Sequence, residues 1–264
     1  INQKGGVGKT TTVINLAASL SILGQNNLVI DLDPQGNATT GLGKSNNDDD
    51  NNIYNLLIKR INLKDGLQKT DITNLDLFGS NVNLSGLEVE TANDENRAFI
   101  LKDILNRKYE IIKKYDNVFI DCPPSLSLLT IMALVSAKEI LVPLQTEFFA
   151  LEGITQLVKT IDRIKIKLNP SLNVRGILLT MFDKRNKLSS QVDKEARNYF
   201  KEKVYQSVIP RNVRLSEAPS HGKPCVTYDK SCSGSKAYIK LAEEFMRQNK
   251  KIGSAAWNPK KIRD

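Results

Sequence analysis

Short apolar segments alternate with amphipathic segments along most of this chain. The apolar segments are continuous, as at Val118-Phe119-Ile120, which is typical of strands buried on both faces of a parallel sheet. The predicted strands are 28–32, 75–79, 117–121, 139–144, 174–181 and 204–209. The predicted helices are 8–23, 98–114, 126–136, 151–168, 188–201 and 235–249. This alternation predicts a doubly wound α/β fold, with a mostly parallel sheet flanked by helices.

The domain organisation predicted from composition is simple. We expect one domain over residues 1–249, because no second-domain boundary is visible in the sequence. Residues 44–52 are polar and of low complexity, and we interpret them as an exposed loop. Residues 250–264 are basic and sparsely apolar, which predicts a flexible tail.

A glycine-rich loop precedes the first predicted helix, and its sequence is Gln3-Lys4-Gly5-Gly6-Val7-Gly8-Lys9-Thr10-Thr11. Its glycines allow a tight turn that points backbone N–H groups at a polyphosphate. Lys9 can reach the β- and γ-phosphates, and the Thr10 hydroxyl can bind Mg²⁺. The following helix directs its positive dipole end at the same anion.

This loop departs from the usual phosphate-loop pattern G-x-x-x-x-G-K-[ST], a Walker A motif. The pattern requires glycine where this chain has Gln3, and the chain carries an additional lysine, Lys4. A glycine-rich run alone is often only a turn, but residues 13–20 continue it with apolar positions at helical spacing. We therefore predict nucleotide binding by a deviant Walker A loop. Its predicted ATP-binding residues are Lys4, Gly5, Gly6, Val7, Gly8, Lys9, Thr10 and Thr11.

A phosphate loop normally follows a central β-strand. Only Ile1 and Asn2 precede it here, and there is no initiating methionine. We expect that most of the first strand is missing from this sequence. Without that strand, the loop would lose its anchor and the sheet its centre.

Acidic residues follow two of the predicted strands, at the sheet edge where ligands of parallel sheets bind. Asp33 lies nearer the open end of its strand than Asp31, so we predict that Asp33 orients the water that attacks a γ-phosphate. Asp31 is then structural or supports the site through a neighbouring residue. A turn acid before Pro34 is the alternative interpretation of Asp33. Asp121 ends an apolar strand in a Walker B arrangement and is predicted to hold Mg²⁺, if necessary through water; a buried salt bridge is its alternative.

Charge and cysteine content restrict the class of protein. The formal net charge is +9, which suits an anionic partner but also ordinary solubility. No apolar run approaches the roughly 18 residues of a membrane span, and no signal peptide is visible. Cys122, Cys225 and Cys232 are too few and too irregularly spaced for a disulfide or zinc framework. We expect a cytoplasmic protein.

Five segments of this chain together match the motifs of one family. The segments KGGVGKTTT (4–12), DLDPQGNATTGLG (31–43), DCPPSLSLLT (121–130) and IPRNVRLSEAPSHGKP (209–224), together with TEFFALEG (146–153), occur in one chain. Their combination resembles the ParA/Soj chromosome-partitioning ATPases of the MinD/ParA deviant-Walker group, from Asn2 to about Met246. The first segment is typical of the whole superfamily, and the later ones are more specific to Soj-like proteins.

The resemblance implies a homodimer with ATP between its subunits, in which Lys4 reaches the phosphates bound by the other subunit. It implies that Lys9 and Thr10 act on the nucleotide of their own subunit, and that Asp33 supports a weak ATPase activity. It also implies adenine contacts by Met181, Pro210 and Asn212. A core methionine is the alternative interpretation of Met181.

The same resemblance implies nonspecific binding to duplex DNA by the segments 181–188 and 210–217. Within them we predict Arg185 and Arg214 as the DNA-binding residues, because Arg and Lys contacts to phosphates bind DNA independently of sequence. A solvated surface charge is the alternative for each cation. The resemblance further implies a nucleoid-associated bacterial protein and a ParB-type partner that stimulates hydrolysis.

Three other kinds of protein share parts of this sequence pattern, and each fits it less well than a partitioning ATPase. A MinD-like ATPase would bind membranes through an amphipathic C-terminal helix, but the apolar residues of 239–246 are better interpreted as packing on the domain. Electron transfer like that of nitrogenase reductase would need cluster-binding cysteines that this chain does not suit. A nucleotide-binding scaffold without turnover is disfavoured by Asp33 and Asp121.

Overall fold

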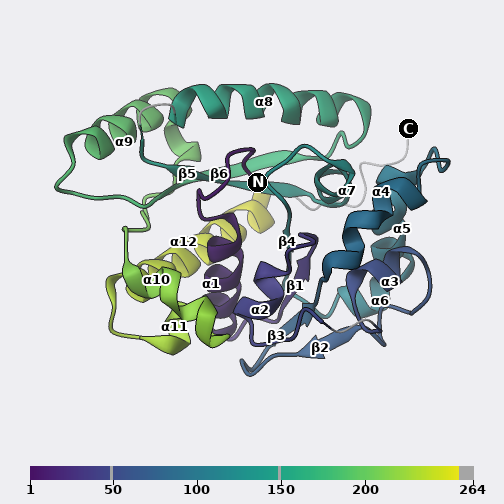
Figure 1. The fold of residues 1–264 in the computed structure, drawn as a ribbon. Helices are drawn as coiled ribbons and strands as arrows, with labels where there is room; N and C mark the ends of the chain where they lie inside the picture. Colours follow the sequence, from purple (N-terminus) through teal and green to yellow (C-terminus); the bar gives the residue numbers. More distant parts are fainter. Residues whose placement is uncertain (48–49, 148–149, 256–264) are drawn as a thin grey trace.

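A computed structural model describes residues 1–47, 50–147 and 150–255 (Figure 1). The remaining residues fall in the predicted loop 44–52, in the TEFFALEG segment and in the predicted tail, so those parts of the predictions lie outside the described residues. The strands are β1 Asn27–Asp31, β2 Leu67–Lys69, β3 Leu75–Phe78, β4 Asn117–Asp121, β5 Glu139–Gln145 and β6 Asn173–Thr180.

The helices of the described residues include several short ones that sequence periodicity did not predict. The α-helices are α1 Lys9–Ile22, α2 Asn37–Gly41, α3 Ile53–Leu57, α4 Leu87–Glu90, α5 Ile100–Arg107, α6 Tyr109–Ile112, α7 Leu128–Ser136, α8 Ala150–Lys167, α9 Lys187–Phe200, α10 Val213–Glu217, α11 Cys225–Tyr228 and α12 Ser233–Ala255. The 3-10 helices are η1 Val82–Gly86, η2 Arg97–Phe99, η3 Lys201–Lys203 and η4 Ala218–His221.

The strands form two hydrogen-bonded groups, with the orders β2-β3-β1-β4 and β5-β6. β1 pairs in parallel with β3 and with β4, and β5 pairs in parallel with β6. β2 is the exception, because it pairs antiparallel with β3 at the edge. The predicted α/β architecture with a mostly parallel, helix-flanked sheet is therefore confirmed.

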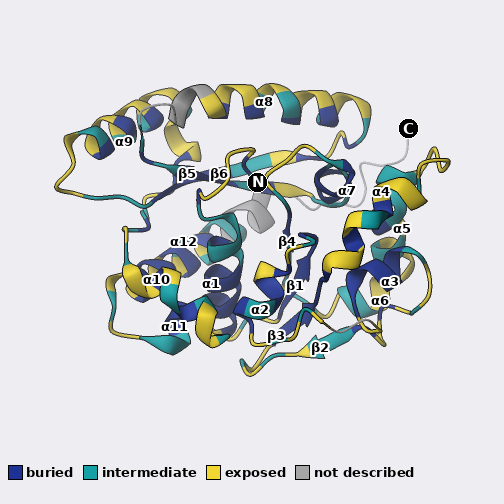
Figure 2. Cartoon of the chain, viewed as in Figure 1, coloured by how far each residue is buried: buried dark blue, intermediate teal, exposed yellow. Residues whose placement is uncertain are grey.

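Both faces of the strands are covered, which explains their continuous apolar sequences. One face packs on α1 and α12 in a core that includes Leu16, Val29, Leu178 and Leu241. The opposite face of β5 and β6 packs on α8 and α9, and the opposite face of β1, β3 and β4 packs on α3, α4, α5 and α7. In Figure 2, β1 and β3 are dark blue throughout, while much of the outer surface of α8 and α9 is yellow.

Ile1 and Asn2 lie against β5. The Ile1 amino group donates a hydrogen bond to the Leu141 carbonyl oxygen at 2.7 Å, and Asn2 Nδ2 donates to the Pro143 carbonyl oxygen at 2.8 Å. The Ile1 side chain packs on the cores beneath both strand groups. These two residues thus attach the phosphate loop to the sheet.

Three predicted elements were wrong in part. Residues 204–209 form no strand and make one isolated bridge, between Val204 and Ile177 of β6. Gln206 N and Ser207 N donate to the Glu244 carboxylate instead of to a strand. The predicted helix 98–114 is divided into η2, α5 and α6, since the backbone at Lys108 leaves the helical region. Helix α12 continues to Ala255, so it enters the predicted tail.

Candidate functional site

The phosphate loop turns tightly between Asn2 and the start of α1. Gly6 has φ 74° and Gly8 has φ 87°, a left-handed conformation in which a side chain would be strained. Helix α1 begins at Lys9, and Thr12 N already donates to the Gly8 carbonyl oxygen at 2.9 Å. The loop therefore delivers free N–H groups and a helix N-terminus to one place, which suits a polyphosphate.

Side chains from distant parts of the sequence hold this loop. Thr180 Oγ1, at the end of β6, donates to the Val7 carbonyl oxygen at 2.9 Å, and Val7 itself is buried. Asn2 Oδ1 accepts from Lys4 N at 3.0 Å. Sequence reasoning missed both Thr180 and Asn2. The only available signal for Thr180 was its position at a strand's carboxyl end.

The two lysines of the loop have different environments. Lys9 Nζ donates to the Lys4 carbonyl oxygen at 2.9 Å, and partial burial lowers the pKa of its ammonium group despite nearby Cys122 and Asp121. The Lys4 side chain is 55% exposed and forms an ion pair with Glu147 of the same chain. Lys9 is thus held inside the site, whereas Lys4 extends outward from it.

Asp31 ends β1 and is fully buried. Its Oδ1 accepts from Asp33 N at 3.0 Å, and its Oδ2 accepts from the backbone N and the hydroxyl of Thr39 at 2.8 and 2.7 Å. Burial raises the pKa of Asp31 to about 6, although these hydrogen bonds oppose the shift. These contacts fix the turn after β1 and tie β1 to α2, which agrees with the structural role predicted for it.

Asp121 lies directly beside Asp31, because the parallel register of β1 and β4 pairs these two residues. Burial, followed by the charge of Asp31, raises the pKa of Asp121 to about 7, while a hydrogen bond with the Thr10 hydroxyl works in the opposite direction. Asp121 Oδ2 is buried without a hydrogen-bond partner among the described residues. An unpaired buried carboxylate oxygen beside a threonine hydroxyl fits the oxygen-rich surroundings that Mg²⁺ prefers.

Asp33 follows β1 at the same edge and is 8% exposed. Its Oδ1 accepts from Gln35 N at 3.0 Å, which fixes the turn through Pro34. Its charge acts on both Lys9 and Asp121. The structure therefore brings Lys9, Asp33 and Asp121 together around the phosphate loop.

The residues predicted to contact adenine also come together. Met181 follows β6 with φ 51°, a strained conformation for this residue type, and is half-buried rather than part of the core. Next to it, Phe182 pairs with Pro210 in a parallel bridge. Asn212 caps α10 through Arg214 N at 2.9 Å, and its Nδ2 donates to Ser233 Oγ at 2.9 Å.

The predicted DNA-binding arginines lie at the surface on this same side of the molecule. The Arg185 side chain is 90% exposed and pairs with Asp183 at 2.9 Å. The Arg214 side chain is 49% exposed, with Glu217 at 2.7 Å and Asp229 at 3.6 Å. Both guanidinium groups are thus accessible, and each already has a carboxylate partner.

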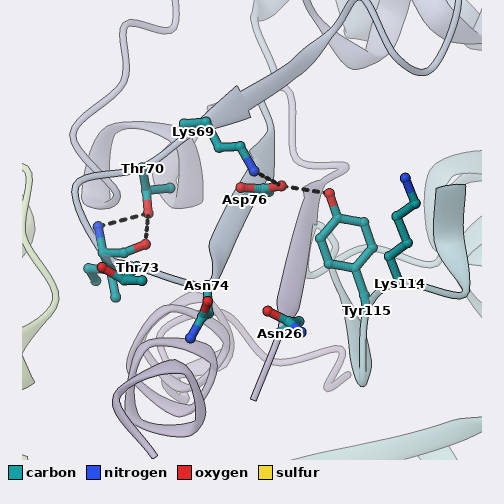
Figure 3. A pocket seen from close by; sticks show the side chains of 9 residues that line it. Asn26, Lys69, Thr70, Thr73, Asn74, Asp76, Lys114 and Tyr115 are labelled. Carbon is teal, nitrogen blue, oxygen red and sulfur yellow. Dashed lines mark hydrogen bonds and ion pairs between the residues drawn. The ribbon is translucent and has the colours of Figure 1, made fainter. Parts of the chain in front are cut away.

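A separate pocket of about 490 Å³ lies at the opposite edge of the sheet, where β1, β3 and β4 begin (Figure 3). There the Asp76 carboxylate accepts from Lys69 Nζ at 2.8 Å and from the Tyr115 hydroxyl at 2.6 Å. Burial and this hydrogen bond raise the pKa of Tyr115. The pocket contains none of the residues predicted from the sequence.

Comparison with known proteins agrees with this arrangement. A family model described as an AAA domain matches residues 1–174. The chain is 49% identical to the chromosome partitioning protein ParA of Caulobacter vibrioides, over 94% of this chain and 93% of that protein. It is 47% identical to the sporulation initiation inhibitor protein Soj of Bacillus subtilis, over 92% and 95% of the respective chains. The chain belongs to the ParA/Soj family.

A solved structure supports the nucleotide and the metal. The fold matches cobyrinic acid a,c-diamide synthase from Mycobacterium smegmatis with a TM-score of 0.82 and 32% identity, over 95% of this chain and 93% of that one. That enzyme was crystallised with ADP and magnesium. A second structure of that enzyme contains an ATP analogue and magnesium. Both agree with the expected cofactors of this ParA/Soj-family site, ATP and Mg²⁺.

The length and polarity of the helices bear on membrane contact. Within the described residues of this ParA/Soj-family chain, no helix is both long enough and apolar enough to cross a bilayer. In α12, Leu241, Ala242 and Phe245 are buried against the domain. The apolar face of that helix is therefore occupied by packing.

Proposed function

We propose that this protein is an ATP-operated switch for chromosome or plasmid partitioning, which binds DNA without reading its sequence and releases it after hydrolysis. The observation that carries the proposal is the meeting of Lys9, Asp33 and Asp121 around a deviant Walker A loop. Membership of the ParA/Soj family supports the partitioning role, since relatives carry the names chromosome partitioning protein and chromosome-partitioning ATPase.

In the proposed mechanism, the loop and the α1 N-terminus bind the phosphates of ATP. Lys9 leaves the Lys4 carbonyl oxygen, which it contacts at 2.9 Å, and moves to the β- and γ-phosphates. Thr10 and Asp121 would hold Mg²⁺, which neutralises phosphate charge when bound. Asp33 accepts a hydrogen bond from the attacking water and orients it toward the γ-phosphorus.

The base of ATP would lie beside Met181 and the segment from Pro210 to Asn212. Phe182 N donates to the Ile209 carbonyl oxygen at 3.0 Å, and Arg211 N donates to the Phe182 carbonyl oxygen at 3.1 Å. These bonds hold the two segments in fixed register at the end of β6. A fixed platform suits a planar base, because little ordering is needed when it binds.

Dimerisation is the step in which Lys4 takes part. Lys4 is exposed at the mouth of the loop and pairs with Glu147. We propose that it exchanges this carboxylate for the phosphates bound by a second copy of the chain. ATP then joins the two subunits, and hydrolysis separates them.

DNA binding in this proposal uses Arg185 and Arg214. Both project at the surface, close to the segments that would hold the adenine. Exchange of their carboxylate partners for DNA phosphates gives binding that is independent of sequence and sensitive to salt. The protein would then associate with the nucleoid, and a ParB-type partner would stimulate its otherwise weak ATPase activity.

A salt titration of ATP-dependent binding tests this function against MinD-like membrane attachment. Purified protein is mixed with ATP and Mg²⁺ and offered either random-sequence duplex DNA or anionic lipid vesicles. We expect retention on DNA that needs ATP and weakens steeply with salt, with little retention on vesicles. ATP-dependent retention on vesicles without retention on DNA would contradict the proposal.

A further inference from the structure

Two cysteines that the proposed ATPase mechanism does not use lie in contact with each other. Cys225 begins α11, and Cys232 directly precedes α12. Their Sγ atoms are 3.4 Å apart. A disulfide bond is about 2.05 Å long, so only a small movement separates this contact from a covalent bond.

The surrounding groups hold both sulfurs in place. Ser235 N donates to Cys232 Sγ at 3.4 Å, and Ser235 Oγ lies 3.3 Å from Cys225 Sγ. Cys232 N donates to Asp229 Oδ1 at 3.1 Å, and Cys225 N donates to Asn15 Oδ1 at 2.7 Å. The pair is therefore positioned by α1 on one side and by the start of α12 on the other.

The two thiols differ in access and in acidity. Cys225 is fully buried, and burial raises the pKa of its thiol to about 11. Cys232 is partly exposed. Burial opposes its ionisation, but hydrogen bonds with the Ser235 hydroxyl and from Ser235 N leave the pKa of its thiol below the ordinary value. An accessible thiol of lowered pKa beside a second thiol is the arrangement of a reactive and a resolving cysteine.

We propose that Cys225 and Cys232 form a redox modification site, at which a peroxide converts the two thiols into an intramolecular disulfide. This inference goes beyond the ATP-dependent function and does not require it. The chemistry of the pair selects hydrogen peroxide or a small alkyl hydroperoxide as the oxidant, because the reactive thiol is only partly exposed.

Both steps of the reaction balance. The Cys232 thiolate attacks one peroxide oxygen, so that an S–O bond forms, the O–O bond breaks, and hydroxide leaves to take up a proton. The Cys225 sulfur then attacks the Cys232 sulfur, forming the S–S bond and breaking the S–O bond, and a second water leaves with the Cys225 proton. In sum, two thiols and one hydrogen peroxide give one disulfide and two waters.

The disulfide would form on the loop that positions two residues of the proposed function. Asp229 Oδ2 lies 3.6 Å from Arg214 Nε, and Ser233 Oγ accepts from Asn212 Nδ2 at 2.9 Å. Oxidation would join Cys232, which lies between Asp229 and Ser233 in the sequence, to the first residue of α11. The site is thus placed to communicate redox state to the segment 210–217.

Peptide mapping of the oxidised full-length chain tests the proposal. The reduced protein is treated with hydrogen peroxide, remaining thiols are alkylated in denaturant, and the chain is digested with trypsin. Cleavage after Lys230 separates the cysteines into peptides 215–230 and 231–236. We expect these two peptides to be joined, the number of free thiols to fall from three to one, and dithiothreitol to reverse both changes.

Variants separate this pair from the remaining cysteine. Cys122 is buried directly after β4, away from the pair in sequence, and the variant Cys122→Ser should form the disulfide as the wild type does. Cys232→Ser should form no joined peptide, and Cys225→Ser should stop at a Cys232 sulfenic acid that a dimedone probe captures. Three outcomes would overturn the proposal: retention of all three free thiols, a disulfide that includes Cys122, or a disulfide only between two chains. All three are measured on the wild-type chain, so they do not depend on whether a variant folds.

Discussion

The buried acids at the phosphate loop and the exposed arginines near α10 use charge in opposite ways. Asp31 and Asp121 lie side by side in the core, where burial raises both pKa values. Arg185 and Arg214 are accessible and hold carboxylate partners that solvent can replace. Ionisation of the two acids is therefore unfavourable unless a cation binds beside them, whereas each arginine exchanges one modest ion pair for another.

This difference predicts how each region responds to substitution. Groups in the buried site depend on one another, so a single change should have a large effect. Surface cations should act nearly independently and lose strength as salt is added. The predictions below separate these two behaviours, beginning with the largest effect.

Loss of the partly buried lysine of the phosphate loop, Lys9, should have the largest consequence. We expect Lys9→Ala to weaken ATP binding about 100-fold, because the hydrogen bonds of a charged group to phosphate are lost. Calorimetric titration with ATP and Mg²⁺ measures this effect. Lys240→Ala, at an exposed position of α12, is the control. Equal affinities of the two variants would contradict the role of Lys9.

The buried carboxylates predict how stability depends on pH in the absence of nucleotide. The pKa of Asp121 rises from 3.8 in the unfolded chain to about 7 in the folded one. The folded protein therefore holds the proton that the unfolded chain releases, and the free energy of unfolding falls as pH rises through this window and then levels. Asp121→Asn should remove part of that fall and stabilise the protein above pH 7 by about 2 kcal/mol.

Urea unfolding on both sides of that window measures this effect. Asp71→Asn, at an exposed position, is the matched control and should leave the pH dependence unchanged. If the free energy of unfolding of Asp121→Asn and of the wild type changed with pH in the same way, the charge on Asp121 would not destabilise the folded protein.

The exposed arginines should show the smaller, salt-sensitive behaviour. We expect Arg185→Glu and Arg214→Glu each to weaken ATP-dependent DNA retention about tenfold, and to lower its salt dependence, while ATP affinity is unchanged. Arg107→Glu on α5 makes the same change of charge far from both segments. If all three variants weaken binding equally, only net charge matters and the assigned residues are wrong.

Lys4 should show the smallest effect, because it must give up Glu147 before it can contact a phosphate. We expect Lys4→Gln to weaken dimerisation with a slowly hydrolysed ATP analogue about fivefold. Glu147→Gln should leave dimerisation equal or stronger, since it releases Lys4. Light scattering across protein concentration measures both. Weaker dimerisation in Glu147→Gln would mean that the ion pair supports the dimer.

The sequence predicted the site best where the functional residues lie next to the turn, helix or strand that positions them. The run from Gly5 to Thr10 carries its own turn and helix start, and Asp33 and Asp121 follow apolar segments directly. These features predicted the sheet, the loop and the edge at which the acids meet. The assigned roles of Asp33, Arg185 and Arg214 stay predictions that the substitutions above test.

What the sequence could not predict depends on contacts between distant segments. Nothing near Thr180 indicates that its hydroxyl holds the loop at Val7, and nothing near Lys4 indicates Glu147. Residues 204–209 have a strand-like pattern, yet Glu244 on α12 takes the backbone N–H groups that a ladder would use. Periodicity records which side chains are apolar but not which partners the backbone finds.

Release of DNA by the variant Asp33→Ala tests the central claim most directly. Protein bound to duplex DNA with ATP and Mg²⁺ is transferred to buffer without ATP, and bound protein and released phosphate are followed together. We predict that wild-type protein leaves the DNA as phosphate appears, whereas Asp33→Ala binds ATP normally, releases phosphate at least about 100-fold more slowly and stays on the DNA. Normal phosphate release by Asp33→Ala, or equally fast departure from DNA without hydrolysis, would contradict the account.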